Sequence, residues 1–598
     1  MGENRTRLHA MENSLAHETF YKSGTYINES LGLWTGWVSH RGSFSDCMPV
    51  WNESKDICII FSGEDFSDRS DIDYLRSRGH EFDPEDASYL VHLYEEFDQK
   101  AFEKLNGWFS GLLVDLREGK VVLFNDRYGM NRIYYHENER GFYFASEAKA
   151  LLKVLPALRQ LDMSSLGECF SCGCALQNRT LFLGISLLPG GSAWILSPEG
   201  KAAKRRYFRS AEWENQAKLS AKEYYGKLKE TWARILPRYL RGRERVGMSL
   251  TGGVDGRMIM AWVARPPGDF PCYTFGGMFR DCVDVNIARR VADICRQPHH
   301  VLPVGREFLG QFPALAERTV YVTDGAMDVS GSADLFVNRI AREIAPVRLT
   351  GNYGQEILRS AVAFGPRSLV EGLFEPEFGR LVQKAKQTYS KELTTRGLSF
   401  IAFKQVPWHH YSRLSVEMSQ LVLRSPYIDN DLVALAYRVP QNLAATNELS
   451  LRLIAEGNPT LGKIATDRGI LYRPIPLVTS LNRFYQEFTF KAEYAYDYGM
   501  PQWLARIDHL FRKGHLERFF LGRHKFYHFR TWYRNELSEY VKSVLLDPRS
   551  LNRPYLNAER VEAIVKGHIK GYRNYTSEIH RLLTAELIQR RLIEGAEL

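Results

Sequence analysis

Cysteine and long apolar runs are both scarce in this chain. Only eight of its 598 residues are cysteine, and residues 1–20 are polar and charged where a secretory signal would be apolar. No stretch approaches the roughly 18 apolar residues that a membrane-spanning helix needs. These features predict a reduced, cytoplasmic protein with no membrane partner.

A strong charge of one sign is missing too. The chain has 79 basic and 70 acidic residues, a net charge of +9 that is mild for this length. That balance suits an anionic ligand such as a nucleotide. No basic stripe is interleaved with aromatic residues, so we expect no nucleic-acid partner. Hydrophobic residues make up 44% of the chain, enough for two to four domains.

The pattern of apolar residues divides the chain into three parts. Strand-like runs, with one helix expected at 86–105, predict a mixed α/β module in the first third. A polar, basic linker is expected at 201–218. Beyond it, helical stretches alternate with short apolar runs, which indicates a parallel sheet with covering helices. Beyond about residue 480 the pattern is typical of amphipathic helices. We therefore expect domains at 1–205, 206–480 and 481–598.

The clearest chemical signal is the segment 249–257, with the sequence S-L-T-G-G-V-D-G-R. A strand is expected before it and a helix after it. Two adjacent glycines, Gly252 and Gly253, allow the backbone to approach an anion, and the helix N-terminus directs free amides toward a phosphate. Asp255 is a candidate magnesium ligand. The G-x-x-x-x-G-K-[ST] pattern is absent, which disfavours γ-phosphate transfer.

This loop resembles S-G-G-x-D-S, the pyrophosphate loop of enzymes that split ATP between the α and β phosphates. Thr251 stands at the first serine of that pattern and Gly256 at the last. Arg257 follows, and its charge could contact phosphate where the serine hydroxyl is missing.

Further motifs, in the same order along the chain, resemble the asparagine synthetase family. Residues 125–135 (N-D-R-Y-G-M-N-R-I-Y-Y) and 144–152 (F-A-S-E-A-K-A-L-L) are similar to its glutaminase domain. Residues 273–276, 349–356 (L-T-G-N-Y-G-Q-E) and 424–429 (R-S-P-Y-I-D) are similar to its synthetase domain. The resemblance runs from about residue 30 to about residue 590.

The resemblance implies an α/β fold in three parts. A degenerate α/β sandwich like that of N-terminal-nucleophile hydrolases precedes a doubly wound parallel-sheet ATP pyrophosphatase domain, which carries a helical cap. The implied activity is that of an AMP-forming carbon–nitrogen ligase. It adenylates a carboxylate with ATP and Mg²⁺, and ammonia or an amine then attacks.

The resemblance also implies a set of synthetase-site residues. Gln355 stands at the family's second magnesium-binding aspartate, so Asp255 and Glu356 are the expected metal ligands. Asn352 stands at the general-base glutamate and cannot take a proton. Arg468 stands at a catalytic lysine, so Arg468, Asn352 and Glu356 form the expected catalytic set. The expected ATP-binding residues are Leu250, Thr251, Gly252, Gly253, Asp255, Gly256, Arg257, Phe275, Thr350 and Gly351.

The glutaminase half departs from the family pattern. The family's glutaminase begins with a nucleophilic cysteine, but the first cysteine here is Cys47, and we expect the first strand to be missing. The oxyanion-hole asparagine is replaced by Ser62, which precedes Gly63. Only Asp86 matches a residue that holds glutamine. These three residues form a vestigial glutamine site, and we expect no glutaminase activity.

Several functions and partners remain open at this point. The carboxylate could belong to a small molecule or a peptide, and the nitrogen donor could be free ammonia, ammonia from a partner protein or an amine of the substrate. Lasso-peptide cyclases, which resemble this family, are one alternative. A catalytically degenerate nucleotide-binding scaffold is another. A homodimer is also compatible with the sequence. Cys169, Cys172 and Cys174 are expected to be core or loop thiols rather than metal ligands.

Overall fold

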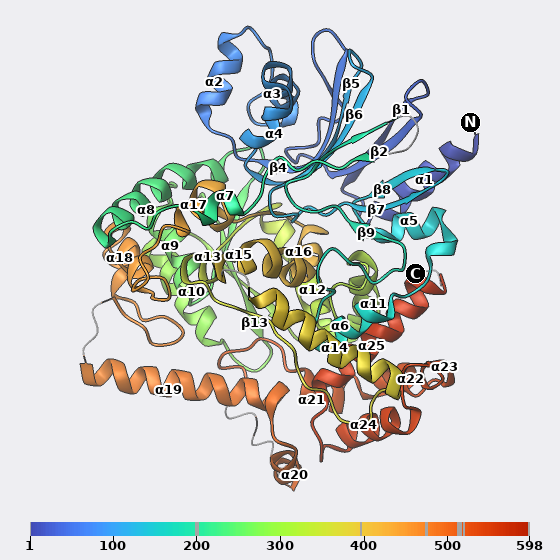
Figure 1. The fold of residues 1–598 in the computed structure, drawn as a ribbon. Helices are drawn as coiled ribbons and strands as arrows, with labels where there is room; N and C mark the ends of the chain where they lie inside the picture. Colours follow the sequence, from blue (N-terminus) through green and yellow to red (C-terminus); the bar gives the residue numbers. More distant parts are fainter. Residues whose placement is uncertain are drawn as a thin grey trace.

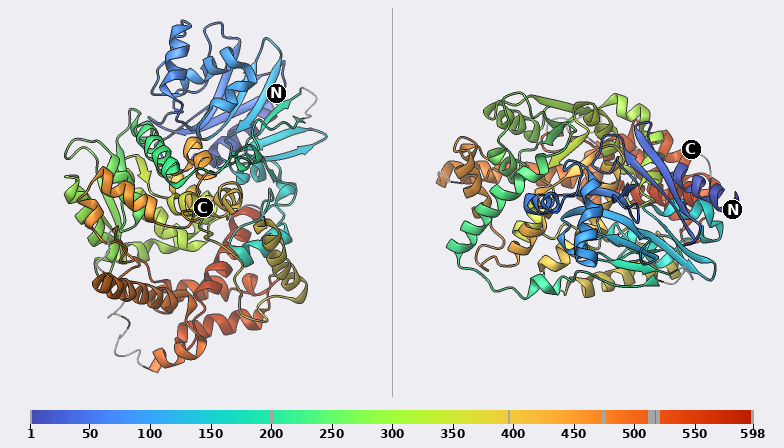
Figure 2. Two further views of the ribbon diagram at one scale, coloured as in Figure 1. Left: turned by 60° about the vertical axis from the view of Figure 1, so that its left-hand side comes forward. Right: turned by 90° about the horizontal axis from the view of Figure 1, so that it is seen from above.

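The chain forms two lobes, and a layer of helices lies on the side of the second lobe away from the first (Figure 1). The computed structural model describes residues 2–197, 202–394, 397–472, 476–510, 517 and 521–595. In Figure 1 and in the left view of Figure 2, the N-terminal lobe lies at one end of the molecule and the C-terminal helices lie at the other. None of the helices among these residues is long and apolar enough to cross a bilayer.

A six-stranded antiparallel sheet organises the N-terminal lobe. Its order is β11-β10-β6-β5-β4-β3. The strands are β3 (Val50–Trp51), β4 (Ile57–Asp65), β5 (Gly107–Asp115), β6 (Lys120–Asn125), β10 (Ala193–Leu196) and β11 (Ala202–Ala203). Side chains alternate between its faces, so Ile57 and Ile59 enter one apolar cluster while Cys58 and Ile60 enter another. Both faces are therefore covered, as in a sandwich.

Smaller elements cover that sheet. The hairpin β1 (Tyr21–Asn28) and β2 (Leu33–His40) and the three-stranded sheet β8-β7-β9 lie on one side. The bounds of the latter are β7 (Tyr134–Asn138), β8 (Gly141–Ala145) and β9 (Ser186–Leu187). Helices in this lobe are α1 (Gly2–Leu15), α2 (Arg69–Ser77), α3 (Leu90–Phe97), α4 (Ala101–Lys104), α5 (Ala148–Val154) and α6 (Met163–Cys172).

One sequence expectation for this half is wrong. The single helix expected at 86–105 is broken, because Asp98 adopts a left-handed φ of 48° that ends α3 before α4 begins. Residues 202–218 of the expected linker connect the two lobes, and the later part of this segment is packed against the second lobe. Phe208 is buried there, and Trp213 of α7 (Ala211–Glu214) contacts Phe403 and Tyr437. Aromatic side chains in a polar segment thus fix the path between the lobes.

A five-stranded, all-parallel sheet forms the second lobe, as the alternating pattern predicted. Its order is β14-β13-β12-β15-β16. The strands are β12 (Val246–Ser249), β13 (Cys272–Gly277), β14 (His299–Val304), β15 (Val347–Thr350) and β16 (Val422–Arg424). The chain moves from β12 outward to β13 and β14, then returns to the other side of β12. The strand order therefore reverses between β12 and β15, where α/β sheets bind ligands at the carboxyl ends of their strands.

Helices surround this sheet and form the end of the molecule. Those of the sheet lobe include α8 (Ala221–Ile235), α9 (Val254–Trp262), α10 (Val283–Ile294), α11 (Arg306–Val322), α12 (Ser332–Ile344), α13 (Gly354–Arg359), α14 (Pro376–Leu393), α16 (Tyr411–Met418), α17 (Asn430–Ala436) and α18 (Glu448–Gly457). The C-terminal layer comprises α19 (Pro476–Tyr494), α20 (Gln502–Leu510), α21 (Phe529–Arg534), α22 (Ser538–Leu545), α23 (Pro548–Leu551), α24 (Ala558–Lys570) and α25 (Thr576–Ile588). α25 packs on α11, which confirms the predicted helical C-terminus.

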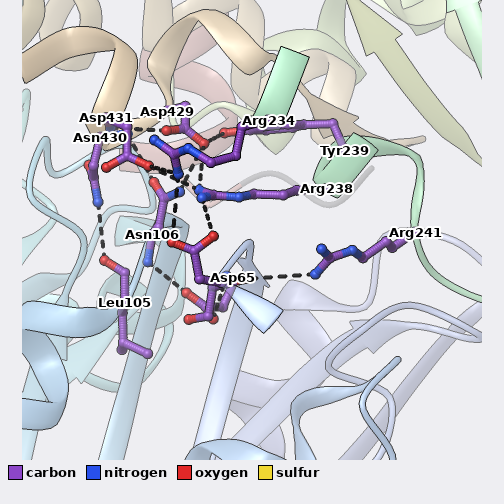
Figure 3. A network of polar contacts seen from close by, with 12 residues as sticks. Asp65, Leu105, Asn106, Arg234, Arg238, Tyr239, Arg241, Asp429, Asn430 and Asp431 are labelled. Carbon is purple, nitrogen blue, oxygen red and sulfur yellow. Dashed lines mark hydrogen bonds and ion pairs between the residues drawn. The ribbon is translucent and has the colours of Figure 1, made fainter. Parts of the chain in front are cut away.

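Buried polar contacts join the two lobes (Figure 3). Asn106, beside β5, donates to the carboxylate of Asp429 at 2.9 Å, and Tyr239 donates to the same oxygen at 3.1 Å. Arg238 lies 3.4 Å from that carboxylate. Burial raises the pKa of Asp429 to about 6, and Arg238 opposes the shift. Near the same interface, Glu64 of β4 accepts two hydrogen bonds from the buried Arg424 of β16.

Candidate active site

The predicted pyrophosphate loop connects β12 to α9 at the point where the strand order reverses. Gly252 donates its amide to Asp284 at 2.8 Å, and a Cβ atom there would lie 3.0 Å from that carboxylate. Gly253 differs, because an added Cβ would meet only Thr251 Oγ1, at 3.4 Å. No side chain caps the N-terminus of α9. Thr251, Gly253 and the first amides of α9 therefore present an open backbone surface that suits a phosphate.

Three other predicted ATP-binding residues, Leu250, Gly256 and Gly351, pack behind this surface. Leu250 is fully buried and donates its amide to Tyr273 at 2.9 Å. Gly256 packs against Gly351 so closely that a Cβ at Gly351 would lie 2.5 Å from the Gly256 amide nitrogen. These two glycines bring the β12 and β15 loops together, a contact that no larger residue permits.

Thr350 lies on β15 and Phe275 on β13, the two strands that flank β12. Thr350 is buried and accepts a hydrogen bond from the Asn352 amide at 3.2 Å. Phe275 is half-buried, with the Arg348 guanidinium 5.3 Å from its ring centre and Phe526 packed edge-on at 5.5 Å. A partly exposed aromatic ring beside the loop is compatible with adenine, although its role stays a prediction.

Asp255 is engaged by protein groups rather than pointing into the open loop. Both of its oxygens accept from Arg359 of α13, at 2.7 and 2.8 Å, and the Gln355 amide also donates to it. Burial raises the pKa of Asp255, and Arg359 opposes the rise. In this arrangement the residues fit Mg²⁺ poorly, because a cation already occupies the carboxylate. The metal role predicted for Asp255 would require the ion pair to open.

Glu356 is the carboxylate with the most useful chemistry. It lies on α13 and is largely buried, with His410 at 3.6 Å. Burial, with the nearby charge of Asp255, raises the pKa of Glu356 to about 7. Burial lowers the pKa of His410 to about 3, so this imidazole is neutral at physiological pH. A carboxyl group that titrates near neutrality is suited to proton transfer, a role the neutral Asn352 cannot fill.

Arg257 does not face the phosphate surface. It is buried and donates to the carbonyls of Gly252, Ile464 and Ala465, so it ties the loop to the segment before Arg468. Burial lowers the pKa of Arg257 to about 10. These contacts favour a structural role over the phosphate contact expected from the sequence.

Arg468 is the better placed cation. The Asp467 amide donates to Gly252 at 3.2 Å, so the neighbouring Arg468 lies beside the loop. Its guanidinium stacks over Phe490, 3.2 Å from the ring centre, and its Nε lies 3.4 Å from Asp467. The side chain is 38% exposed, which leaves it free to turn toward a ligand.

Two half-buried acids beside Gly252 were missed from the sequence. Asp284 begins α10, and Asp467 lies in the segment after α18. Burial, and the charge of Asp467, raise the pKa of Asp284 to about 6, while burial raises the pKa of Asp467. Neither acid is close to the loop in sequence. The only local signal was the polar segment T-D-R-G at 466–469, of which only the arginine was singled out.

Asn352 and Tyr353 connect the synthetase loop to the N-terminal lobe. Asn352 is exposed, and its carbonyl accepts from Ser425 at 2.7 Å. Tyr353 is buried in a left-handed conformation with a φ of 73°, between Trp108 and His410. A non-glycine residue in that conformation is strained, and such strain gathers at functional sites.

The vestigial glutamine residues lie on the facing part of the N-terminal lobe. Ser62 and Gly63 are adjacent in β4, and the Ser62 carbonyl accepts from Asn131 at 3.1 Å. Asp86 caps a turn and pairs with Arg243 at 3.3 Å. Burial, and the charge of Asp86, raise the pKa of the Cys47 thiol to about 12. Cys47 is therefore protonated at neutral pH and unsuited to nucleophilic attack.

A cavity of about 180 Å³ extends from these residues toward the synthetase sheet. Its wall includes Ser62 and Asn131 on the N-terminal side, and Leu423 and Ser425 at the end of β16. The cavity is therefore bordered by Ser62 and Gly63 of the predicted glutamine site and by the end of β16, and none of the predicted ATP-binding or catalytic residues lines it.

Comparison with known proteins agrees with this arrangement. Residues 2–208 match the glutamine amidotransferase domain family, and residues 227–457 match the asparagine synthase family. Glutamine-hydrolysing asparagine synthetase 3 of Bacillus subtilis (strain 168) is 25% identical over 318 residues, 50% of this chain and 51% of that protein. Asparagine synthetase 1 of the same strain is 20% identical over 58% of this chain and 54% of that protein.

A plant protein shows the same extent of likeness. Asparagine synthetase 3 of Arabidopsis thaliana is 23% identical over 50% of this chain and 48% of that protein. The chain spans about half the length of these relatives. An amidotransferase domain followed by a synthase domain is the order that the motifs predicted, and these findings support the asparagine synthetase family.

Proposed function

We propose that this chain is an ATP-dependent amide-forming ligase of asparagine synthase type. The observation that carries the proposal is the open backbone surface at Thr251, Gly253 and the uncapped start of α9. It lies at the position where parallel α/β sheets bind ligands. Similarity to the asparagine synthase family supports ATP as the ligand of this loop. The amidotransferase match supports a nitrogen donor for the same reaction.

The reaction would proceed in two steps. A carboxylate oxygen attacks the α phosphorus of ATP, pyrophosphate leaves, and an acyl-adenylate forms. Ammonia or an amine then attacks the acyl carbon, AMP leaves, and the amine gives up a proton. In this scheme the loop amides hold the phosphates, Arg468 stabilises the departing pyrophosphate, and Glu356 accepts the proton. Mg²⁺ would enter with the nucleotide, and the scheme uses no magnesium held by Asp255.

Isotope exchange between ATP and pyrophosphate tests this proposal directly. The purified chain should catalyse exchange in the presence of one carboxylate among aspartate, uronic acids and acidic peptides. Release of ADP and phosphate instead would contradict α-phosphate chemistry. The alternatives would also separate: exchange that needs an acidic peptide would favour a lasso-peptide cyclase, and ATP binding without any exchange would favour a scaffold. The named relatives favour the ligase.

The nitrogen donor gives a separate prediction. We expect product formation with ammonium but not with glutamine, because Ser62 lacks the amide of an oxyanion-hole asparagine and the Cys47 thiol is protonated. The measurement is glutamate release from glutamine, with ammonium-dependent AMP formation as the control for an active preparation. Glutamate release near 1 per second, an ordinary enzymatic rate, would show that the amidotransferase domain is active.

The raised pKa of Glu356 predicts how kcat/KM should depend on pH. As a base it must be ionised, so kcat/KM should fall about tenfold per pH unit below its pKa of about 7 and level off above it. Glu356→Gln should lower the plateau by about 100-fold or more, in the range of general-base catalysis, and should remove the inflection near pH 7. His410 titrates far lower and cannot mimic this inflection. An unchanged profile in the variant would exclude Glu356 as the base.

A further inference from the structure

Four metal-ligating side chains converge in the N-terminal lobe, away from both sites described above. They are Glu53 in the loop between β3 and β4, His80 after α2, and His92 and Glu95 on α3. One ligand atom from each lies within 4.8 Å of all the others. We call these residues the His80–His92 cluster. α2 and α3, which carry or flank most of it, form the outer end of the lobe in Figure 1.

The spacing of the cluster atoms resembles a metal coordination shell. His80 Nδ1 lies 3.7 Å from Glu53 and 3.8 Å from Glu95, and His92 Nδ1 lies 3.5 and 3.3 Å from the same two carboxylates. Good N–H···O hydrogen bonds are shorter, about 2.7–3.2 Å. Zinc bonds to nitrogen and oxygen of about 2.0–2.2 Å place neighbouring tetrahedral ligands about 3.4 Å apart. Of these four contacts only the one between His92 and Glu95, at 3.3 Å, is a hydrogen bond, and all four distances are close to the spacing of ligands around one ion.

Surrounding groups orient two of the four ligands, His80 and Glu95, toward the centre. His80 Nε2 lies 3.0 Å from a Glu96 oxygen, and the other Glu96 oxygen accepts from Arg78 at 3.2 Å. This carboxylate holds the proton on Nε2 and leaves Nδ1 free to bind a metal, the arrangement typical of metal-bound histidine.

Glu95 is held in the same manner. Its Oε1 accepts from the buried Asn52 at 3.0 Å, while its Oε2 is the oxygen nearest the histidines. Asn52 is itself fixed, because its side-chain oxygen accepts the amides of Asp56 and Ile57. His92 is buried and its ring stands 4.5 Å from that of His80. Only Glu53 is largely exposed, at 54% of its side chain, which provides an entry path.

We infer that the His80–His92 cluster binds a divalent transition-metal ion of the zinc type. Two imidazoles and two carboxylates suit zinc, whereas Mg²⁺ and Ca²⁺ favour oxygen ligands alone. Four protein ligands fill a tetrahedral shell and leave no open position for substrate, so the ion has a structural role. It would fasten the Glu53 loop and the segment after α2 to α3, three separate segments within residues 53–95.

Metal binding by the tag-free, full-length protein tests the inference. After treatment with a chelator, the wild type should take up one zinc ion more per chain than His80→Gln/His92→Gln, and Co²⁺ should give the visible absorption of a tetrahedral site only in the wild type. Zinc should raise the thermal midpoint of the wild type and not of the double variant. His9→Gln, which changes an exposed histidine paired with Glu12, is the matched control.

Two milder variants keep the test decisive if the double variant fails to fold. Glu96→Gln leaves all four ligands in place and should weaken zinc binding about 10- to 100-fold, the usual effect of losing a carboxylate behind a metal-bound histidine. Glu53→Gln removes one exposed ligand and should weaken binding at least as much. Equal zinc affinity in the wild type and in these variants would overturn the inference, and so would the absence of any zinc uptake by the wild type.

Discussion

Gly253→Val should abolish measurable ATP binding in a protein that still folds. The Gly253 backbone has a φ of −72°, which valine tolerates, and an added Cβ meets no atom closer than 3.4 Å. The branched side chain would instead project into the space where a phosphate meets the loop amides. Because those amides and the start of α9 supply the phosphate contacts, we expect ATP affinity to fall by about 100-fold or more, equivalent to roughly 3 kcal/mol.

The measurement is calorimetric titration with ATP, alongside circular dichroism to confirm folding. Gly226→Val is the matched control, since Gly226 is exposed on α8 and an added Cβ there meets no atom within 4 Å. ATP affinity that survives in a folded Gly253→Val protein would mean that the nucleotide lies elsewhere. In that case both the loop assignment and the proposed ligase chemistry would fail together.

Arg468→Ala should lower turnover by about 100-fold or more while ATP affinity stays nearly unchanged. The pyrophosphate that leaves during adenylation gains negative charge, and stabilising such charge in a partly dry site contributes several kcal/mol, about 2.7–4 for a single donor. Arg468 lies next to the loop and pairs with Asp467 only at 3.4 Å, so its guanidinium remains available. The loss falls on the transition state, and so kcat should fall rather than KM rise.

Steady-state kinetics of AMP formation, with ATP affinity measured separately, test this expectation. Arg468→Lys should restore part of the rate, because lysine keeps the charge but not the two-pronged hydrogen bonding. Arg452→Ala changes an exposed arginine of α18 that pairs with Glu456, and serves as the control. Full turnover by Arg468→Ala would show that Arg468 stands at the position of the catalytic lysine of asparagine synthetases by chance. The amides of α9 would then be the remaining source of stabilisation, because Arg257 is committed to backbone carbonyls.

Local patterns predicted the framework of the site. The apolar run before Gly252 and the helix after it became β12 and α9, because strand, glycine turn and helix are each encoded by neighbouring residues. The alternation of strands and helices beyond residue 220 became the parallel sheet. Since the carboxyl ends of parallel strands share one edge, the loops after β12 and β15 had to meet once that sheet formed, as Gly256 and Gly351 do.

Contacts between distant segments escaped prediction. Arg359 follows Asp255 by about a hundred residues, and nothing in either motif indicated that the two would pair. Arg257 looked free because its partners are carbonyls near residue 464, which carry no sequence signature. Among the metal-ligating cluster, only His92 and Glu95 share a local pattern, an i, i+3 pair on one helix face. His80 and Glu53 join them solely through the fold.

The buried contacts between the lobes bear on how this family can change over time. Glu64 and Asn106 of the N-terminal lobe satisfy Arg424 and Asp429 of the synthetase lobe, and all four residues are buried. Removing one partner of a buried ion pair typically costs about 3–5 kcal/mol. Loss of glutamine hydrolysis would leave these contacts in place, whereas deletion of the first lobe would remove the partners of Arg424 and Asp429. The contacts therefore favour keeping the first lobe whether or not it hydrolyses glutamine.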